Sequence, residues 1–148
     1  MDLRALFGPM LGRWTGAEHQ EATPEAPATS TRAMMIFKLD LADTVVLQEY
    51  RHVREGGGEL AGHGIFQAAG PDELAWWFFD STGRPPTTAS GSWRDDVLTV
   101  VRNTPTGTAQ HEFWIRDDHL HCRITQRSAD GGEPQLFLTA RYERISGH

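Results

Sequence analysis

The sequence predicts an all-β protein, a single up-and-down antiparallel β-barrel of about ten strands with a short N-terminal helix. Segments of about eight to ten residues are rich in β-branched and aromatic side chains, and Gly, Pro, Asp and Asn separate them. Most of the connections are short enough for hairpins. Because a meander of this length leaves exposed edges unless it closes on itself, a barrel is favoured.

Only the N-terminus has helical spacing. Its apolar residues recur at the intervals of one helix face: Leu3, Leu6, Phe7, Met10 and Leu11. Asp2 is placed to cap the first turn, and Gly8 with Pro9 limits the helix to about two turns. We expect so short an amphipathic helix to plug an apolar opening.

The strands are expected to follow one another without a composition break, so residues 1–148 are predicted to form one domain. They lie near 11–19, 30–39, 44–54, 59–68, 73–80, 86–93, 96–103, 108–116, 119–127 and 135–144. The connection 20–29 is longer than the others, and Pro24 and Pro27 make it unsuitable for an interior strand.

Composition excludes several classes of protein. The chain has 148 residues, 39% hydrophobic and 23% charged, which is typical of a folded globular domain. The net charge of −6 argues against a nucleic-acid partner, and no apolar run approaches the roughly 20 residues of a membrane helix. The start of the chain lacks the pattern of a signal peptide, so we expect a cytoplasmic location. The single cysteine, Cys122, excludes an intrachain disulfide framework.

Hairpin registers predict which side chains face the lumen, because opposed residues share a face. A two-residue turn at 117–118 and a loop at 104–107 independently predict the same inner surface in the second half of the chain. That surface comprises Leu98, Val100, His111, Phe113, Cys122 and Ile124.

In the first half of the chain, a loop at 40–43 places Val46 opposite Phe37 and Gln48 opposite Met35, and turns Tyr50 inward. The loop Gly56–Gly58 then brings Tyr50 near His63. In the aromatic run at 76–79, Trp76 and Phe78 are the favoured inward pair.

The predicted lumen is therefore apolar and aromatic with a few polar groups, which is the composition of a small-molecule site. The expected ligand-binding residues are Gln48, Tyr50, His63, Trp76, Phe78, His111 and Phe113. The alternative is a fully packed core in which the polar side chains are satisfied by one another.

A motif at the start of the first expected strand resembles a known family. Leu11-Gly12-Arg13-Trp14-Thr15-Gly16 contains the Gly-x-Trp of the calycin signature, which lipocalins and their relatives share. The resemblance implies a calycin-like, lipocalin-like barrel in which Trp14 seals the floor. It also implies that an arginine of the last strand, Arg141 or Arg144, stacks on that tryptophan.

Further stretches resemble a family of small bacterial calycin-like proteins known only as domains of unknown function. They are Gln48-Glu49-Tyr50, Gly62-His63-Gly64-Ile65-Phe66, Trp77-Phe78-Phe79-Asp80-Ser81-x-Gly83 and Gly91-Ser92-Trp93. More distantly, the chain is similar to fatty-acid-binding-protein-like barrels and to nitrobindins, which bind haem through a histidine near the C-terminal end of the barrel. The last expected strand here has no histidine, so haem would need His111 or His63.

Three functions remain open at this point. The first is binding of a small hydrophobic or aromatic molecule in the lumen. The second is an enzyme for isomerisation or cyclisation, with Tyr50, His63 or His111 as acid or base. The third is haem carriage through an interior histidine; no other cofactor is predicted.

Other chemical groups have structural interpretations. His119 and His121 share a face and could begin a metal site, but no third ligand is placed near them, so no metal is predicted. Cys122 is expected to be buried filler. Arg84 could steer an anionic ligand at the barrel mouth, while Asp80 is expected to cap its turn. Exposed aromatic residues such as Trp77 or Trp114 would suit a homodimer face.

Overall fold

The structure, a computed structural model, describes residues 1–53 and 57–146. Within those residues the chain forms one short α-helix, one 3-10 turn and ten strands. They are α1 (Leu3–Phe7), η1 (Gly8–Met10), β1 (Gly12–Gln20), β2 (Thr29–Asp40), β3 (Val45–Val53), β4 (Glu59–Ala68), β5 (Leu74–Asp80), β6 (Thr87–Arg94), β7 (Val97–Thr104), β8 (Gly107–Arg116), β9 (His119–Ser128) and β10 (Gln135–Ser146).

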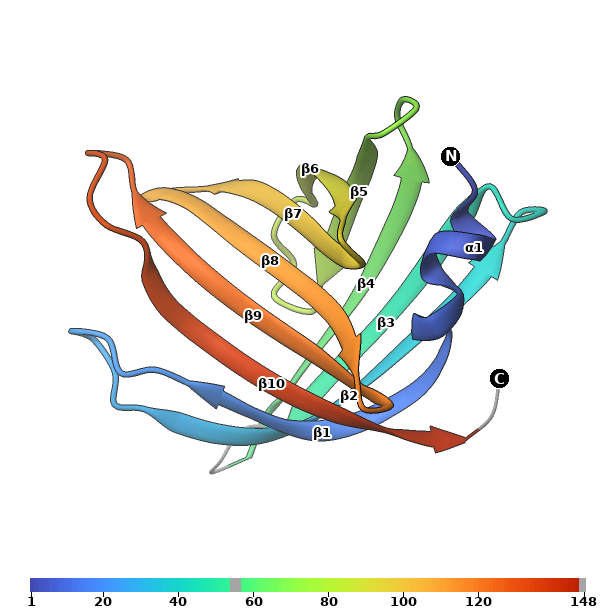
Figure 1. The fold of residues 1–148 in the computed structure, drawn as a ribbon. Coiled ribbons are helices and arrows are strands. Elements are labelled where there is room, and N and C mark those ends of the chain that lie inside the picture. Colours follow the sequence, from blue (N-terminus) through green and yellow to red (C-terminus); the bar gives the residue numbers. More distant parts are fainter. Residues whose placement is uncertain (54–56, 147–148) are drawn as a thin grey trace.

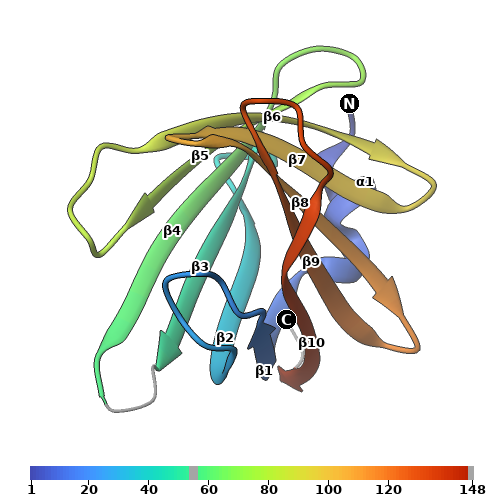
Figure 2. The same cartoon turned by 90° about the vertical axis from the view of Figure 1, so that its left-hand side faces the viewer.

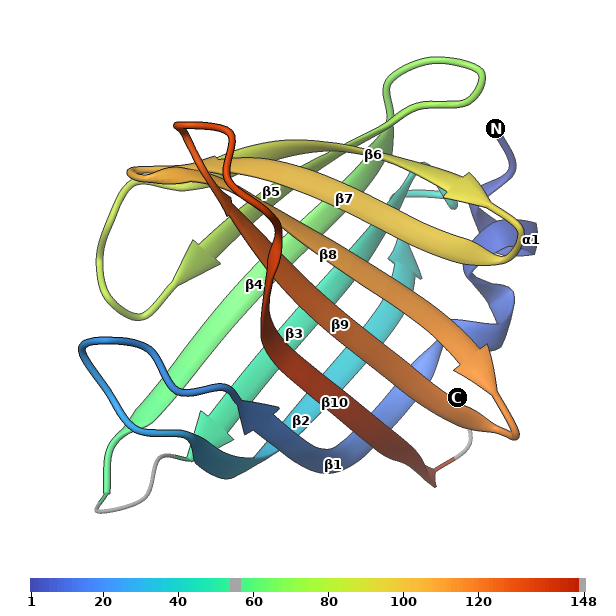
Figure 3. The ribbon, with the colours of Figure 1, turned by 60° about the vertical axis from the view of Figure 1, so that its left-hand side comes forward.

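The ten strands close into one antiparallel barrel, in the order β1-β10-β9-β8-β7-β6-β5-β4-β3-β2 (Figure 1). Every strand pairs with its neighbours in sequence, and β1 pairs with both β2 and β10. The seam between β1 and β10 faces the viewer in Figure 3. The predicted fold class is therefore confirmed, and the expected strand ends agree to within about two residues. Arg54 of the third expected strand and Gly56 of the following loop lie outside the described residues.

Tight turns fix the register of the second half of the barrel. Asp117 and Asp118 have φ values of 52° and 60°, and a two-residue hairpin turn of type I′ needs positive φ at both central positions. Aspartate tolerates this conformation better than most residues. As a result Arg116 pairs with His119, and Phe113 pairs with Cys122, as the sequence predicts.

The register in the first half differs from the prediction. Asp40 pairs with Val45, so the loop is 41–44, and Phe37 opposes Gln48 rather than Val46. This shift by two residues leaves every side chain on its predicted face, because the side-chain period of a strand is two.

The predicted inward position of His63 is wrong. Tyr50 pairs with Gly62, and His63 pairs with Glu49 on the outer face, where it is exposed. The difference is a single residue of register across the β3–β4 hairpin, and one residue moves a side chain to the opposite face of a sheet.

The N-terminal helix plugs one end of the barrel, as expected (Figure 1). The side chain of Asp2 accepts a hydrogen bond from the backbone N–H of Ala5 and caps α1. Phe7 is fully buried, with its ring 5.2 Å from that of Phe66 and 5.3 Å from that of Trp93. Figure 2 looks toward the opposite end of the barrel, where the loops β1–β2, β5–β6 and β9–β10 lie.

Candidate functional site

The barrel contains a cavity of about 420 Å³ on the inner side of its strands. Apolar and aromatic side chains form most of its wall, and a few polar groups are set into it. The lining comprises Glu18, Met35, Gln48, Tyr50, Leu60, Trp76, Phe78, Asp80, Arg84, Pro85, Thr87, Arg102, Asn103, Pro105, His111, Phe113, Cys122, Ile124, Leu138 and Tyr142. Six of the seven residues predicted to bind a ligand lie in this wall; His63 does not.

Two glycines on β4 leave room for the aromatic wall. A Cβ at Gly62 would lie 2.3 Å from the ring of Phe78, and a Cβ at Gly64 would lie 2.3 Å from Oε1 of Gln48. Real Cβ atoms do not approach other atoms so closely, so the inner face of β4 must stay bare here. Phe78 and the Gln48–Trp76 pair occupy the space.

Gln48 and Trp76 form a hydrogen bond in this space. The indole Nε1–H of Trp76 donates to Oε1 of Gln48 over 3.1 Å, and Nε2 of Gln48 lies 3.7 Å from the sulfur of Met35. Both side chains are buried. The contact holds the indole against the wall and satisfies the amide, which would otherwise be costly to bury.

His111 and Arg102 form the polar part of the wall on β7 and β8. Nε of Arg102 donates to Nε2 of His111 over 3.0 Å, so this imidazole nitrogen carries no proton. Burial, with the charge of Arg102 adding to it, lowers the pKa of His111 to about 3. His111 is therefore a neutral hydrogen-bond acceptor at physiological pH.

A second polar group lies on β1, β3 and β10, and the sequence analysis missed its central residue. Glu18 is 4% exposed, and its two carboxylate oxygens accept hydrogen bonds of 2.5 Å from the hydroxyls of Tyr50 and Tyr142. Nδ1 of His52 lies 2.7 Å from the Tyr50 oxygen. Burial and the neighbouring carboxylate raise the pKa of Tyr142, so its phenol remains a donor.

The alternation of side chains along β1 is the sequence feature that predicts an inward position for Glu18. Trp14 was placed on the barrel floor, and residues 16 and 18 share its face because side chains alternate along a strand. Glu18 is therefore inward by parity.

The mouth of the cavity carries charges of both signs. Arg84, in the β5–β6 connection, lines the cavity as the sequence analysis anticipated. The carboxylate of Asp80 accepts hydrogen bonds from the backbone N–H and the hydroxyl of Thr82, which confirms its predicted turn-capping role.

The remaining candidates have structural roles. Burial raises the pKa of the Cys122 thiol, and the charges of Glu18 and Glu112 raise it further, so Cys122 is an inert part of the wall. On the outer face, the ring of His121 stacks on Trp114 with centroids 5.4 Å apart. Among residues 1–53 and 57–146, no group of three or more His, Cys, Asp or Glu side chains is arranged to hold a metal ion.

The haem alternative gains no support from the two histidines considered for it. His63 lies on the outer face, and Nε2 of His111 is already engaged by Arg102. An axial ligand needs an unprotonated ring nitrogen that faces the iron.

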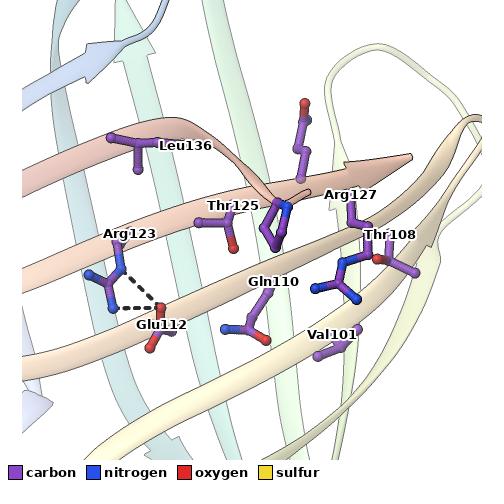
Figure 4. Close-up of a pocket in the computed structure, with 10 residues that line it drawn as sticks. Val101, Thr108, Gln110, Glu112, Arg123, Thr125, Arg127 and Leu136 are labelled. Atoms are coloured by element: carbon purple, nitrogen blue, oxygen red, sulfur yellow. Dashed lines mark hydrogen bonds and ion pairs between the residues drawn. The ribbon is translucent and has the colours of Figure 1, made fainter. Parts of the chain in front are cut away.

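A larger hollow of about 730 Å³ lies on the outer face of β7 to β10 (Figure 4). Its wall includes the ion pair between Glu112 and Arg123, in which Nε of Arg123 donates over 3.0 Å. Most of its other lining residues, such as Gln110 and Thr125, lie on the outward face of the same strands. Because these polar groups are open to water, we consider the enclosed lumen the better candidate site in spite of its smaller volume.

Comparisons with known proteins show which solved structures have a similar fold. No protein-family model matches the sequence, and no curated protein does. Among solved structures, the chain is similar to Rv2717c from M. tuberculosis, with 15% identity, 99% of each chain covered and a TM-score of 0.74. It is also similar to the S-type phycobiliprotein lyase CPES from Guillardia theta, with 8% identity, 100% of this chain and 95% of that chain covered, and a TM-score of 0.70.

A third similar structure is EF1p2_mFAP2b bound to DFHBI, with 11% identity, 96% of this chain and 98% of that chain covered, and a TM-score of 0.52. At these identities the likeness shows the fold alone. The chain is thus a closed ten-stranded up-and-down β-barrel with a largely apolar lumen, closed at one end by its N-terminal helix. In the part of the chain that the structure describes, no helix combines the length and apolarity needed to cross a bilayer.

Proposed function

We propose that the protein binds a small, largely apolar or aromatic molecule inside its barrel. The observation that carries the proposal is the cavity of about 420 Å³, walled mainly by apolar side chains with a few polar groups set among them. Small-molecule sites have volumes of roughly 300–1,000 Å³ and this kind of lining. A barrel with a solid core would have no such space.

The comparisons support the proposal at the level of the fold. EF1p2_mFAP2b, a similar barrel over 96% of this chain, is bound to DFHBI. A barrel of this general shape therefore accommodates a small molecule. The ligand of the present chain is a separate question, because the wall residues determine it.

The test compares two substitutions on adjacent residues of β9 that face opposite sides of the wall. Ile124 lines the lumen and Thr125 lines the outer hollow. The probe is N-phenyl-1-naphthylamine, a neutral aromatic amine whose emission rises in apolar surroundings. We expect Ile124→Trp to fill the lumen and weaken probe binding by at least about tenfold, while Thr125→Trp leaves binding as in the wild type.

Leu138→Trp fills the same lumen from β10 and provides a second variant of this kind. If Thr125→Trp abolishes probe binding and the two lumen variants do not, the ligand site is the outer hollow. Native mass spectrometry of the purified protein then reports the mass of any natural ligand and the number of subunits.

Catalysis, by isomerisation or cyclisation of a bound substrate, is a second candidate function. The hydrogen-bonded series His52, Tyr50 and Glu18 favours it, because it sets a proton donor and an acceptor into an enclosed apolar wall. His111 suits the role of acid or base poorly, since a pKa of about 3 makes the ring a weak base that stays neutral near pH 7. Conversion of a ligand identified by mass spectrometry, lost in Glu18→Gln while binding persists, would support catalysis.

We also propose, from the motifs quoted above, that the chain belongs to the small bacterial calycin-like family of unknown function. A cytoplasmic location, a homodimer and the absence of a nucleic-acid partner are proposed on the sequence alone. Subunit counting by native mass spectrometry tests the homodimer.

A further inference from the structure

Arg102 is a cation placed inside an apolar barrel. It lies on β7 two residues after the fully buried Val100, on the same inward face, and its side chain is half-buried in the cavity wall. Burial lowers the pKa of its guanidinium. A cation in such a position normally has a carboxylate beside it.

Within residues 1–53 and 57–146, no carboxylate forms an ion pair with Arg102. Among the described residues, the one hydrogen-bond partner of the Arg102 side chain is the neutral ring nitrogen Nε2 of His111. Asp80 is the carboxylate that acts on Arg102 through its charge; its Oδ1 accepts hydrogen bonds from Thr82, and it forms no ion pair with Arg102. The contact with His111 uses only Nε, so the two terminal nitrogens of the guanidinium are left for another partner.

Four charged side chains line the cavity: Glu18, Asp80, Arg84 and Arg102. At the mouth, Arg84 and Asp80 carry opposite charges, so Arg102 is the cation of the inner wall. Glu18 is set into β1, which three strands separate from β7 in one direction and five in the other, so the two charges lie nearly opposite each other. An anion is therefore attracted to the wall of β7 and repelled from the wall of β1.

We propose that Arg102 is the anion-binding group of the lumen, and that the ligand is a largely apolar or aromatic molecule bearing one oxyanionic group such as a carboxylate. This inference rests on the proposed ligand-binding function and specifies its chemistry. His111 holds the guanidinium in place as a positioning residue, and Trp76 and Phe78 contact the apolar body. The planar guanidinium of an arginine presents parallel N–H donors, whose geometry matches the oxygens of an oxyanion.

The experiment uses two probes that differ in one group. 1-Anilinonaphthalene-8-sulfonate carries a sulfonate, and N-phenyl-1-naphthylamine is the same aromatic amine without it. We expect the wild type to bind the anionic probe more tightly than the neutral one. Arg102→Met is expected to weaken binding of the anionic probe by about tenfold or more while changing binding of the neutral probe by less than about twofold.

Two further variants make the result specific. Arg123→Met removes an arginine from the outer hollow and should leave the binding of both probes unchanged. Arg102→Lys keeps the charge but loses the planar guanidinium, so it should retain part of the preference for the anionic probe. Thermal unfolding verifies that each variant is folded. If Arg102→Met does not fold, Arg102→Gln takes its place as the variant without the positive charge, and Arg102→Lys remains the variant that keeps it.

The outcomes separate the two proposals. If the wild type binds neither probe, the proposed function fails and this inference with it. If the neutral probe binds in the lumen but the Arg102 substitutions leave the anionic probe unaffected, the anion site is refuted while ligand binding stands. Loss of the anionic probe in Arg123→Met rather than Arg102→Met would place the anion on the outer surface and also refute the inference.

Discussion

The guanidinium of Arg144 lies over the indole of Trp14, with 4.3 Å between the guanidinium carbon and the ring centroid. The same guanidinium donates to the backbone carbonyl oxygens of Leu11, over 2.5 Å, and Pro9, over 2.9 Å. Nε1–H of the Trp14 indole donates to the carbonyl of Met10 over 2.9 Å. These contacts connect the end of β10 to the segment between α1 and β1.

We expect Arg144→Met to lower the free energy of unfolding by about 1–3 kcal/mol. The substitution removes a cation–π contact and leaves two carbonyl oxygens without their charged donor. Urea unfolding followed by tryptophan emission measures the change. The resemblance to calycins left Arg141 and Arg144 open for this position, and the structure assigns it to Arg144.

Arg141→Met is the matched control, because Arg141 lies on the same strand but is exposed, with its guanidinium beside the ring of His119. Its effect should stay within about 0.5 kcal/mol, as is usual for surface substitutions. Equal losses in the two variants would contradict the role assigned to Arg144.

Gly64→Ala should disturb the lumen wall rather than only the strand that carries it. Its Cβ would lie 2.3 Å from Oε1 of Gln48 and 2.7 Å from Nε1 of Trp76, so the hydrogen bond between those side chains must break or shift. We expect a loss of about 1–3 kcal/mol in unfolding free energy and a changed tryptophan emission spectrum.

Gly70→Ala serves as the control for that substitution, since the nearest atom to its Cβ would be 3.8 Å away, an ordinary contact. It should cost little and leave the emission spectrum unchanged. A Gly64→Ala variant as stable as Gly70→Ala would mean that the wall adapts without strain.

The sequence predicted the inner face best where turn chemistry fixes the register. The pair Asp117–Asp118 admits one hairpin geometry, and every opposed pair from Phe113 to Cys122 follows from it. The β3–β4 hairpin has a glycine-rich tip that fits several loop lengths, so the register there was uncertain by one residue. One residue was sufficient to place His63 on the wrong side of the sheet.

The charged groups on the inner faces of β1 and β7 were the hardest to predict. Glu18 and Arg102 obey the alternation of their strands, but hydropathy places ionised side chains outside, and nothing in the sequence shows which partners offset their burial. Glu18 is supported by Tyr142, 124 residues away in the sequence. Contacts of this kind depend on barrel closure, which local patterns cannot resolve.

The low pKa of His111 predicts how stability depends on pH. In the unfolded chain a histidine takes up a proton near pH 6.5, whereas folded His111 stays neutral down to about pH 3. Between these values the unfolded state binds more protons, so the contribution of His111 is complete above pH 6.5 and is lost as the pH falls toward 3. By pH 5 the loss amounts to about 2 kcal/mol.

His111→Gln keeps an acceptor for Arg102 but does not titrate, so its unfolding free energy should fall less steeply than that of the wild type between pH 7 and pH 5. Urea unfolding at several pH values measures the two slopes. His63→Gln, at an exposed position on the outer face, is the control for replacing a histidine by glutamine outside the lumen. If His111→Gln and the wild type lose stability in parallel over this range, His111 does not remain neutral in the folded barrel, and its role as the acceptor that positions Arg102 is excluded.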